Sequence, residues 1–170
     1  AMGYKTYIPI LEPIKVESTV QFDEAKSQLE NKYFKITIDK TTGALSSVFD
    51  KQNNRGMVDR NSSEGFGEYI YEQAGQETID TYNKNYIKPG AEGWANDEMI
   101  RSAVPNKKDN IYTGLLEKVV YLNMGNAVQA TVFGKLNDAD QQRYLVTYTL
   151  YENQPYIEIN WGVDGKKPNS

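Results

Sequence analysis

The chain has 170 residues, with 23 acidic and 19 basic side chains and a formal charge of −4. This length suits one domain that buries enough surface to fold without a disulfide or a metal. Cysteine and histidine are both absent, which excludes a thiol nucleophile, a thiolate metal site, a Ser-His-Asp triad and a two-histidine zinc helix. The acidic balance and the lack of a long apolar run argue against nucleic acid or a membrane as partner. Composition therefore favours a binding or structural module.

The N-terminal part of the sequence predicts little regular structure. Residues 4–10 predict a short extended segment, and residues 14–20 alternate in polarity as an edge strand does. Residues 22–29 (FDEAKSQL) are the one stretch with helical character, over one or two turns, or else they form a linker. The sequence thus predicts a leading strand or linker segment over residues 1–28 and a β-sandwich domain over residues 29–170.

The remainder of the chain is dominated by period-two alternation of polar and apolar residues. The pattern predicts strands over residues 33–39, 44–50 and 66–72. Four further alternating runs follow, separated by short turns: residues 115–124, 127–136, 142–151 and 156–163. Short turns between alternating runs predict an antiparallel meander. We therefore expect an all-β antiparallel β-sandwich with little helix.

Residues 73–113 show almost no periodicity, so the sequence predicts a long loop there. Loops of that length in compact domains are usually functional or disordered, and the aromatic content of this one argues against disorder. Trp94 is its best candidate for a ring that stacks on a sugar, the alternative being a packing role within the domain.

Without histidine or cysteine, acid–base chemistry would need paired carboxylates. Glu68 and Glu72 share a strand face but lie about 13 Å apart, beyond the ~5–9.5 Å of glycosidase pairs. Three other acids at strand ends or turns could converge, or could be solvated turn residues: Asp50, Asp59 and Glu64. Residues 138–140 (DAD) lack the glycine and distal glutamate of a calcium loop, which favours a hairpin turn.

Aromatic residues are the other candidates, since the chain has 13 tyrosines and 2 tryptophans. Tyrosines on strand faces either pack across strands or offer flat surfaces to sugar rings. Two pairs share a strand face in the predicted sheets: Tyr69 with Tyr71, and Tyr144 with Tyr148. Trp161 continues the apolar face of the last predicted strand, so we expect it in the core.

Three stretches together resemble a known family: residues 29–51 (LENKYFKITIDKTTGALSSVFDK), residues 65–72 (GFGEYIYE) and residues 158–168 (EINWGVDGKKP). They are similar to the C-terminal β-domain of family 38 glycoside hydrolases, the α-mannosidase-like enzymes. The resemblance extends over residues 3–168, although residues 73–113 match nothing in it. It implies the large twisted sandwich shared with galactose mutarotase-like and sugar-binding domains.

The resemblance also implies that the chemistry lies elsewhere in a longer parent enzyme. In that family the catalytic aspartate and the zinc ligands belong to an N-terminal α/β domain and a helical bundle. This chain is then a fragment with no metal or cofactor of its own, and its partners are a mannoside-type glycan and the catalytic domain of the same parent chain. An aromatic residue in the stretch matching residues 67–71 approaches the substrate in related enzymes, which implies that role for Tyr69. The related mutarotases need histidine acids, so that activity is not expected here.

Three functions are compatible with these patterns. The favoured one is a non-catalytic domain of a mannosidase-like glycoside hydrolase that packs beside the catalytic domain and lends loops to the sugar site. The alternatives are an autonomous carbohydrate-binding module and an assembly domain without a ligand. The predicted substrate-binding residues are Tyr69, Tyr71 and Trp94, and no catalytic or metal-binding residue is predicted.

Overall fold

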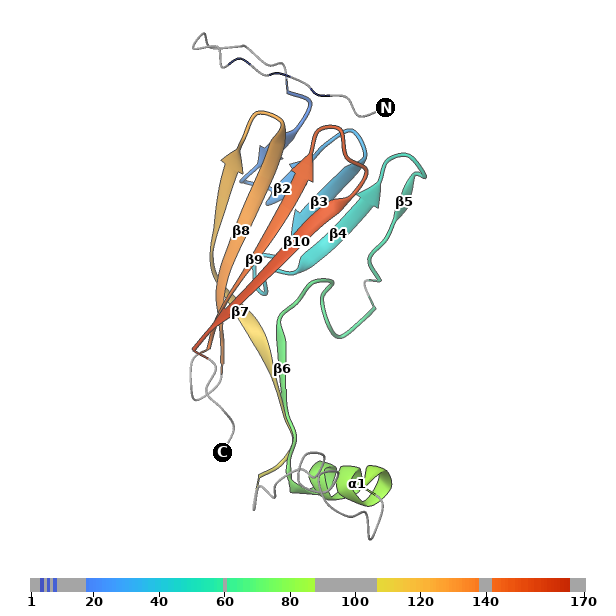
Figure 1. Ribbon diagram of the computed structural model, residues 1–170, viewed down its shortest axis with the longest axis vertical. Helices are drawn as coiled ribbons and strands as arrows, with labels where there is room; N and C mark the ends of the chain where they lie inside the picture. The colour runs from blue at the N-terminus through green and yellow to red at the C-terminus, as the bar shows by residue number, and fades with distance from the viewer. Residues whose placement is uncertain are drawn as a thin grey trace.

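The fold was analysed in a computed structural model that describes Tyr4, Thr6, Ile8 and residues 18–59, 61–87, 107–137 and 142–165. Within these ranges the chain forms two five-stranded antiparallel sheets and an α-helix. The sheets pack face to face in two layers (Figure 1). The predicted all-β antiparallel sandwich is therefore confirmed. Most of residues 4–10 and 14–20 lies outside the described residues, so their predicted extended structure stays a prediction.

The first sheet consists of the N-terminal strands in sequence order. Its strands are β1 (Gln21–Asp23), β2 (Gln28–Glu30), β3 (Phe34–Ile38), β4 (Leu45–Asp50) and β5 (Arg55–Gly56). The strands predicted over residues 33–39 and 44–50 correspond to β3 and β4 and are confirmed. The alternation that predicted them has a physical basis, because their inward residues form half of the core.

The helical character predicted for residues 22–29 is wrong, because this stretch forms β1, a tight turn and β2. The Asp23 carboxylate accepts the Lys26 backbone N–H at 3.1 Å and pairs with the Lys26 ammonium at 2.9 Å, which closes the turn. On the other side, Phe22 stacks on Tyr121 of the opposite sheet with ring centroids 5.4 Å apart. Burial against the second sheet thus outweighs local helix propensity.

The second sheet contains the predicted meander. Its strand order is β10–β9–β8–β7–β6, and the strands are β6 (Ile70–Gln73), β7 (Asn110–Asn123), β8 (Ala127–Leu136), β9 (Arg143–Tyr151) and β10 (Ile157–Asp164). The four C-terminal runs are confirmed as strands. The strand predicted over residues 66–72 is shorter than expected, because Phe66 instead forms an isolated bridge to Leu45 of the first sheet.

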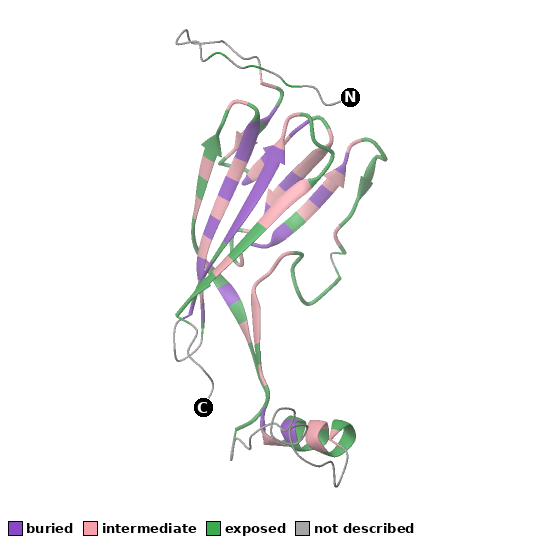
Figure 2. Ribbon diagram, viewed as in Figure 1, coloured by how far each residue is buried: buried purple, intermediate pink, exposed green. Residues whose placement is uncertain are grey.

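The hydrophobic core lies between the two sheets. It is built from inward residues of β2–β4 and of β8–β9, among them Leu29, Ile36, Ile38, Leu45, Val48, Val128, Val132, Val146, Tyr148 and Leu150. Figure 2 shows alternating buried and less buried bands along β8, whereas β9 is buried along most of its length. β9 is thus the most buried strand of the second sheet.

The predicted long loop over residues 73–113 is wrong in part, because it contains the helix α1 (Gln76–Tyr86) and the start of β7. Ile79, Tyr82 and Tyr86 recur at helical spacing, a sequence signal for α1, and the two tyrosine rings stack at 5.3 Å. The ladder of β6 and β7 projects from the sandwich and carries α1 at its far end (Figure 1). Residues 88–106, with Trp94, lie outside the described residues.

Gly75 is the N-cap residue of α1, and it has no side chain that could accept a hydrogen bond from the first turn of the helix. Asp109, the residue before β7, supplies acceptors instead. One of its carboxylate oxygens accepts the Gly75 N–H at 2.6 Å and the other accepts the Thr78 hydroxyl at 2.7 Å. These two bonds, the Gly75 N–H first, lower the pKa of Asp109 below its usual value of 3.8. A residue distant in sequence therefore anchors the helix N-terminus.

We expect Asp109→Asn to loosen the first turn of α1 and to speed amide hydrogen exchange there several-fold at neutral pH. A lowered folded-state pKa stabilises the fold above pH 3.8, and this contribution disappears as the pH falls through the folded-state pKa. In strong acid, the amide hydrogen-exchange rates of α1 should therefore be the same in the variant and in the wild type. Glu77→Gln, an exposed charge change on the same turn, is the control, and equal protection in wild type and Asp109→Asn at neutral pH would contradict the capping role.

Candidate functional site

Trp161 lies on the edge strand β10 with its side chain on the inward face of the second sheet. It is directly opposite Val146 of β9, a core residue, so the two side chains share a face. Nevertheless Trp161 is 45% exposed, whereas Ile157 and Ile159, on the same face of β10, pack against the core. The predicted direction of Trp161 is confirmed and its predicted core burial is wrong.

Tyr69 packs beside this tryptophan. Its ring centroid lies 6.3 Å from Trp161 and 5.2 Å from Tyr144 of β9. The three rings come from the segment before β6, from β9 and from β10, and we call them the aromatic edge. Of the three rings only that of Trp161 is about half exposed, and a ring exposed to this extent can stack on a sugar or pack against an apolar protein surface.

Tyr144 and Tyr148 serve the fold. Tyr144 is 3% exposed and its hydroxyl donates to the Thr42 carbonyl at 2.8 Å. Tyr148 is fully buried, and its hydroxyl donates to the Gly43 carbonyl at 3.0 Å and lies 3.4 Å from that of Gly67. The sequence left a packing or a sugar-contact role open for both tyrosines, and the structure assigns them to packing.

The position of Tyr144 depends on two glycines beneath its ring. Gly134 of β8 lies directly opposite Tyr144, and Gly114 lies one strand further, on β7. A Cβ atom at either glycine would overlap the Tyr144 ring. The turn that Tyr144 holds also needs glycine, because Gly43 has a φ of 78°. The absence of side chains at these glycines therefore allows the Tyr144 ring to pack closely on the backbone. Tyr69 in turn packs against the Tyr144 ring.

Burial raises the pKa of Tyr144 to about 12, from an ordinary value of 10, with smaller contributions from the Glu68 and Glu117 charges. The neutral phenol is thus favoured in the folded state, so its stabilising effect is complete below pH 10 and is lost as the pH rises toward 12. We expect the free energy of unfolding, measured in urea, to fall between about pH 10 and about pH 12.

Tyr144→Phe should show a smaller fall over the same interval, with the exposed Tyr156→Phe as control. Equal pH dependence in Tyr144→Phe and wild type would contradict this assignment. Absorbance titration of the phenols gives a second check, since Tyr144 and Tyr148, whose pKa burial also raises, should ionise last.

Tyr71 and Tyr69 have different aromatic neighbours. Tyr71 lies on β6 directly opposite Tyr112 of β7, and the two rings stack at 5.9 Å. Tyr71 thus belongs to the projecting ladder, whereas Tyr69 belongs to the sandwich edge. The third predicted contact residue, Trp94, lies outside the described residues.

A separate cleft of about 710 Å³ lies on the outer face of the first sheet. Asp59 and Glu64 both line it, so the structure brings these two predicted acids to one site. Asp50 is elsewhere, in a turn where its carboxylate accepts the Gln52 and Asn53 N–H groups and the Asn53 side-chain amide. Sequence reasoning missed this cleft, although Phe49, an aromatic residue at an outward strand position, was a signal.

The described ranges contain neither a metal-binding cluster nor a membrane-spanning helix. No three Asp, Glu, Cys or His side chains in that part of the chain lie close enough to hold a metal ion. None of its helices has the length and apolar character needed to cross a membrane. Residues 138–140, the loosely calcium-like stretch, are outside the described residues.

Two facing antiparallel sheets with an aromatic edge define an all-β sandwich domain. Residues 29–168 match the family model described as glycosyl hydrolases family 38 C-terminal domain. This match spans most of the chain, so the chain belongs to that family, and the resemblance noted in its sequence is confirmed. No curated protein and no solved structure matches the chain at the threshold applied.

Proposed function

We propose that this chain is the non-catalytic β-sandwich domain of an α-mannosidase-like glycoside hydrolase. It packs beside the catalytic domain of the same parent chain and lends loops to a mannoside site, while the metal of the parent is held elsewhere. Membership of the family 38 C-terminal domain supports a glycoside hydrolase parent and a carbohydrate substrate. The observation that carries the docking is the 45% exposure of Trp161 on an inward-facing strand position.

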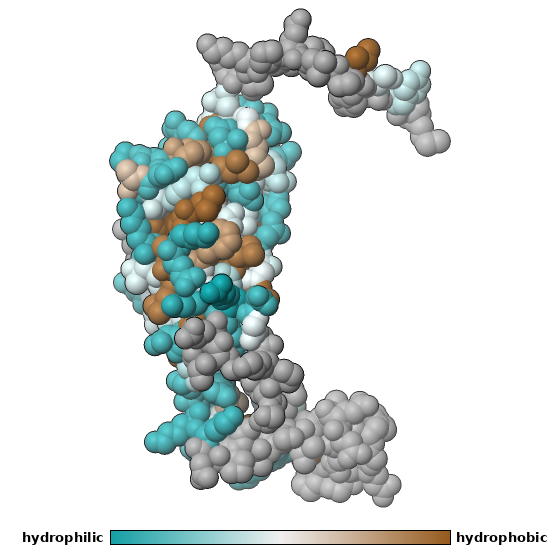
Figure 3. Space-filling model, turned by 90° about the vertical axis from the view of Figure 1, so that its left-hand side faces the viewer, coloured by the Kyte–Doolittle hydropathy of each residue, from teal (hydrophilic) through white to brown (hydrophobic). Residues whose placement is uncertain are grey.

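The aromatic edge has the properties of a surface that another domain covers. Trp161 and Val163 of β10 are both 45% exposed and both face inward, and Trp161 packs against Tyr69. Covering the exposed half of a tryptophan removes roughly 100 Å² from water, which contributes about 2 kcal/mol. On the side of the molecule where β7 and β8 lie, apolar side chains are instead scattered among hydrophilic ones (Figure 3).

The pKa shifts of acidic side chains in the described residues support the proposal that the chain is not itself catalytic. Hydrogen bonds from neighbouring donors lower the pKa of six of them, including Asp39, Asp50 and Asp109. A general acid at neutral pH needs a raised pKa instead. These carboxylates hold turns and a helix end, which are structural tasks.

The non-catalytic part of the proposal is tested by assaying the purified 170-residue chain against aryl α-mannosides. The expected turnover equals that of a mock preparation. Turnover that copurifies with the chain through successive columns would overturn this part.

A second candidate is an autonomous carbohydrate-binding module, favoured by the half-exposed ring of Trp161 in the aromatic edge. Calorimetry of the chain with mannotriose tests it. Binding that is lost in Trp161→Ala or in Trp94→Ala would favour this candidate, whereas no heat at about 10 mM sugar would count against it.

A further inference from the structure

We propose that the cleft on the outer face of the first sheet binds a neutral oligosaccharide, independently of the aromatic edge and of the docking proposed above. Its volume of about 710 Å³ lies within the ~300–1,000 Å³ of small-molecule sites. A hollow of about 290 Å³ adjoins it, sharing Gln28 and Lys35 as lining residues. Together the two hollows extend across β1–β4.

A β-bulge shapes the floor of the cleft. Thr37 pairs with Ser47 and Ile38 with Leu45, which leaves Ser46 as an extra residue on β4. Bulges redirect side chains, and here Ser46 and Ser47 both line the cleft. The Ser46 hydroxyl donates to the Thr37 carbonyl at 3.2 Å, whereas within the described ranges the Ser47 hydroxyl has no hydrogen bond.

Phe49 supplies an aromatic surface beside these hydroxyls. It is the next outward residue on β4 after Ser47, and its cross-strand neighbours are Lys35 and Gly56. Gly56 has no side chain, and a Cβ built there meets nothing within 4 Å. One flank of the Phe49 ring is therefore uncovered, which suits the apolar face of a sugar ring.

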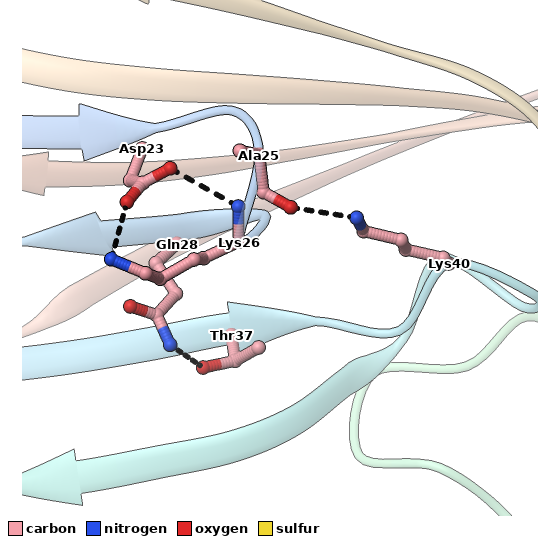
Figure 4. A network of polar contacts seen from close by, with 6 residues as sticks. All are labelled: Asp23, Ala25, Lys26, Gln28, Thr37 and Lys40. Carbon is pink, nitrogen blue, oxygen red and sulfur yellow. Dashed lines mark hydrogen bonds and ion pairs between the residues drawn. The ribbon is translucent and has the colours of Figure 1, made fainter.

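Lys35 and Gln28 supply hydrogen-bond donors. Glu30 lies directly opposite Lys35 on β2 but forms its ion pair with Lys51. Consequently the Lys35 ammonium has no hydrogen bond or ion pair in the described part of the chain. The Gln28 amide is held in place by donating to the Thr37 hydroxyl at 3.2 Å, in the network of the β1–β2 and β3–β4 turns (Figure 4).

The loop that follows β5 forms the wall of the cleft and is fixed at both ends. The Met57 N–H donates to the Val48 carbonyl at 2.8 Å, and at the other end the Leu45 N–H donates to the Phe66 carbonyl at 2.8 Å. Between these points the wall presents Asp59, Ser62 and Glu64. A wall anchored in this way reduces the entropy lost on binding.

The lining determines the class of ligand. Among the described residues that line the cleft, the charged side chains are Lys35, Asp59 and Glu64, one positive and two negative, which disfavours phosphate, nucleic acid and acidic glycans. Serine and threonine hydroxyls, an amide and one partly exposed ring, that of Phe49, match the hydroxyls and apolar face of a neutral sugar. We therefore assign the cleft to a neutral oligosaccharide.

The test is an NMR titration of the ¹⁵N-labelled 170-residue chain with neutral trisaccharides of mannose, glucose, xylose and N-acetylglucosamine. We expect at least one to bind with a Kd on the order of 1 mM and to shift the amides of Lys35, Ser47 and Phe49. The proposal is overturned if none shifts these amides at about 10 mM, or if shifts are confined to the aromatic edge. Tighter binding of a sulfated trisaccharide at the same amides would overturn the neutral assignment.

Three variants keep the result interpretable if one of them folds poorly. Phe49→Ala should weaken binding at least about tenfold, Phe49→Trp should retain it, and Gly56→Leu should weaken it by covering the ring. Phe133→Ala is the matched control, because Phe133 is an outward-facing aromatic of the other sheet, with the Lys118 ammonium 4.6 Å from its ring. Unchanged affinity in both Phe49→Ala and Gly56→Leu would contradict the proposal.

Discussion

Replacing Tyr148 by alanine is expected to lower the free energy of unfolding by about 4 kcal/mol, the largest effect of any single truncation in the core. Tyr148 is fully buried between the sheets, and its hydroxyl reaches the carbonyls of Gly43 and Gly67. The alanine variant therefore loses the ring, leaves a cavity and frees two backbone segments. Urea unfolding followed by circular dichroism measures the change.

Tyr148→Phe separates the ring from the hydroxyl and should cost about 1 kcal/mol. Tyr156→Ala, at a site 48% exposed, is the control and should change the stability by less than about 0.5 kcal/mol. A Tyr148→Ala variant as stable as this control would contradict the central place of Tyr148 in the core.

Asn31→Leu is expected to cost about 4 kcal/mol, because Asn31 joins the two sheets through hydrogen bonds that leucine cannot form. Asn31 is 1% exposed. Its carbonyl oxygen accepts the N–H groups of Tyr33 at 2.8 Å and Phe34 at 2.6 Å, and its amide nitrogen donates to the Tyr151 carbonyl at 2.8 Å. Leucine would leave three polar backbone groups without partners at a buried position.

Asn31→Asp isolates the bond to β9, since it retains an acceptor for the two N–H groups and loses the donor to Tyr151. We expect about half the loss of Asn31→Leu in the same unfolding experiment. Asn153→Ala, which removes the exposed contact of Asn153 with Lys32, is the control. If Asn31→Leu and Asn153→Ala were equally stable, Asn31 would not connect the sheets.

The strands could be predicted from the sequence because their signal is local. Alternation over residues 33–39 and over the four C-terminal runs reflects one buried and one exposed face, and β8 follows its predicted range at both ends. The family could also be predicted, since residues 29–51 carry a pattern that the family model confirms. The same reasoning failed for residues 22–29, because Phe22 packs on Tyr121, which is about a hundred residues away in sequence.

The candidate sites depend on contacts between distant residues, which periodicity does not contain. Trp161 was expected in the core because its face is apolar, but it is 45% exposed on β10, the edge strand of its sheet, beyond the two isoleucines of that strand that pack against the core. The partners of Tyr144 and Tyr148, Thr42 and Gly43, are more than 100 residues away. Similarly, the cleft depends on a β-bulge at Ser46, and the residue types around Ser46 do not predict a bulge there.

Docking of the aromatic edge on the catalytic domain is tested most directly by measuring how tightly this chain binds the separately expressed catalytic part of its parent enzyme. We predict that Trp161→Ser weakens this association at least about tenfold, as expected for losing ~2 kcal/mol of burial. Leu122→Ser, at an outward-facing site of similar exposure (50%), should bind as the wild type does. Equal affinity of the Trp161→Ser and wild-type chains, or no association at all, would contradict the proposed docking.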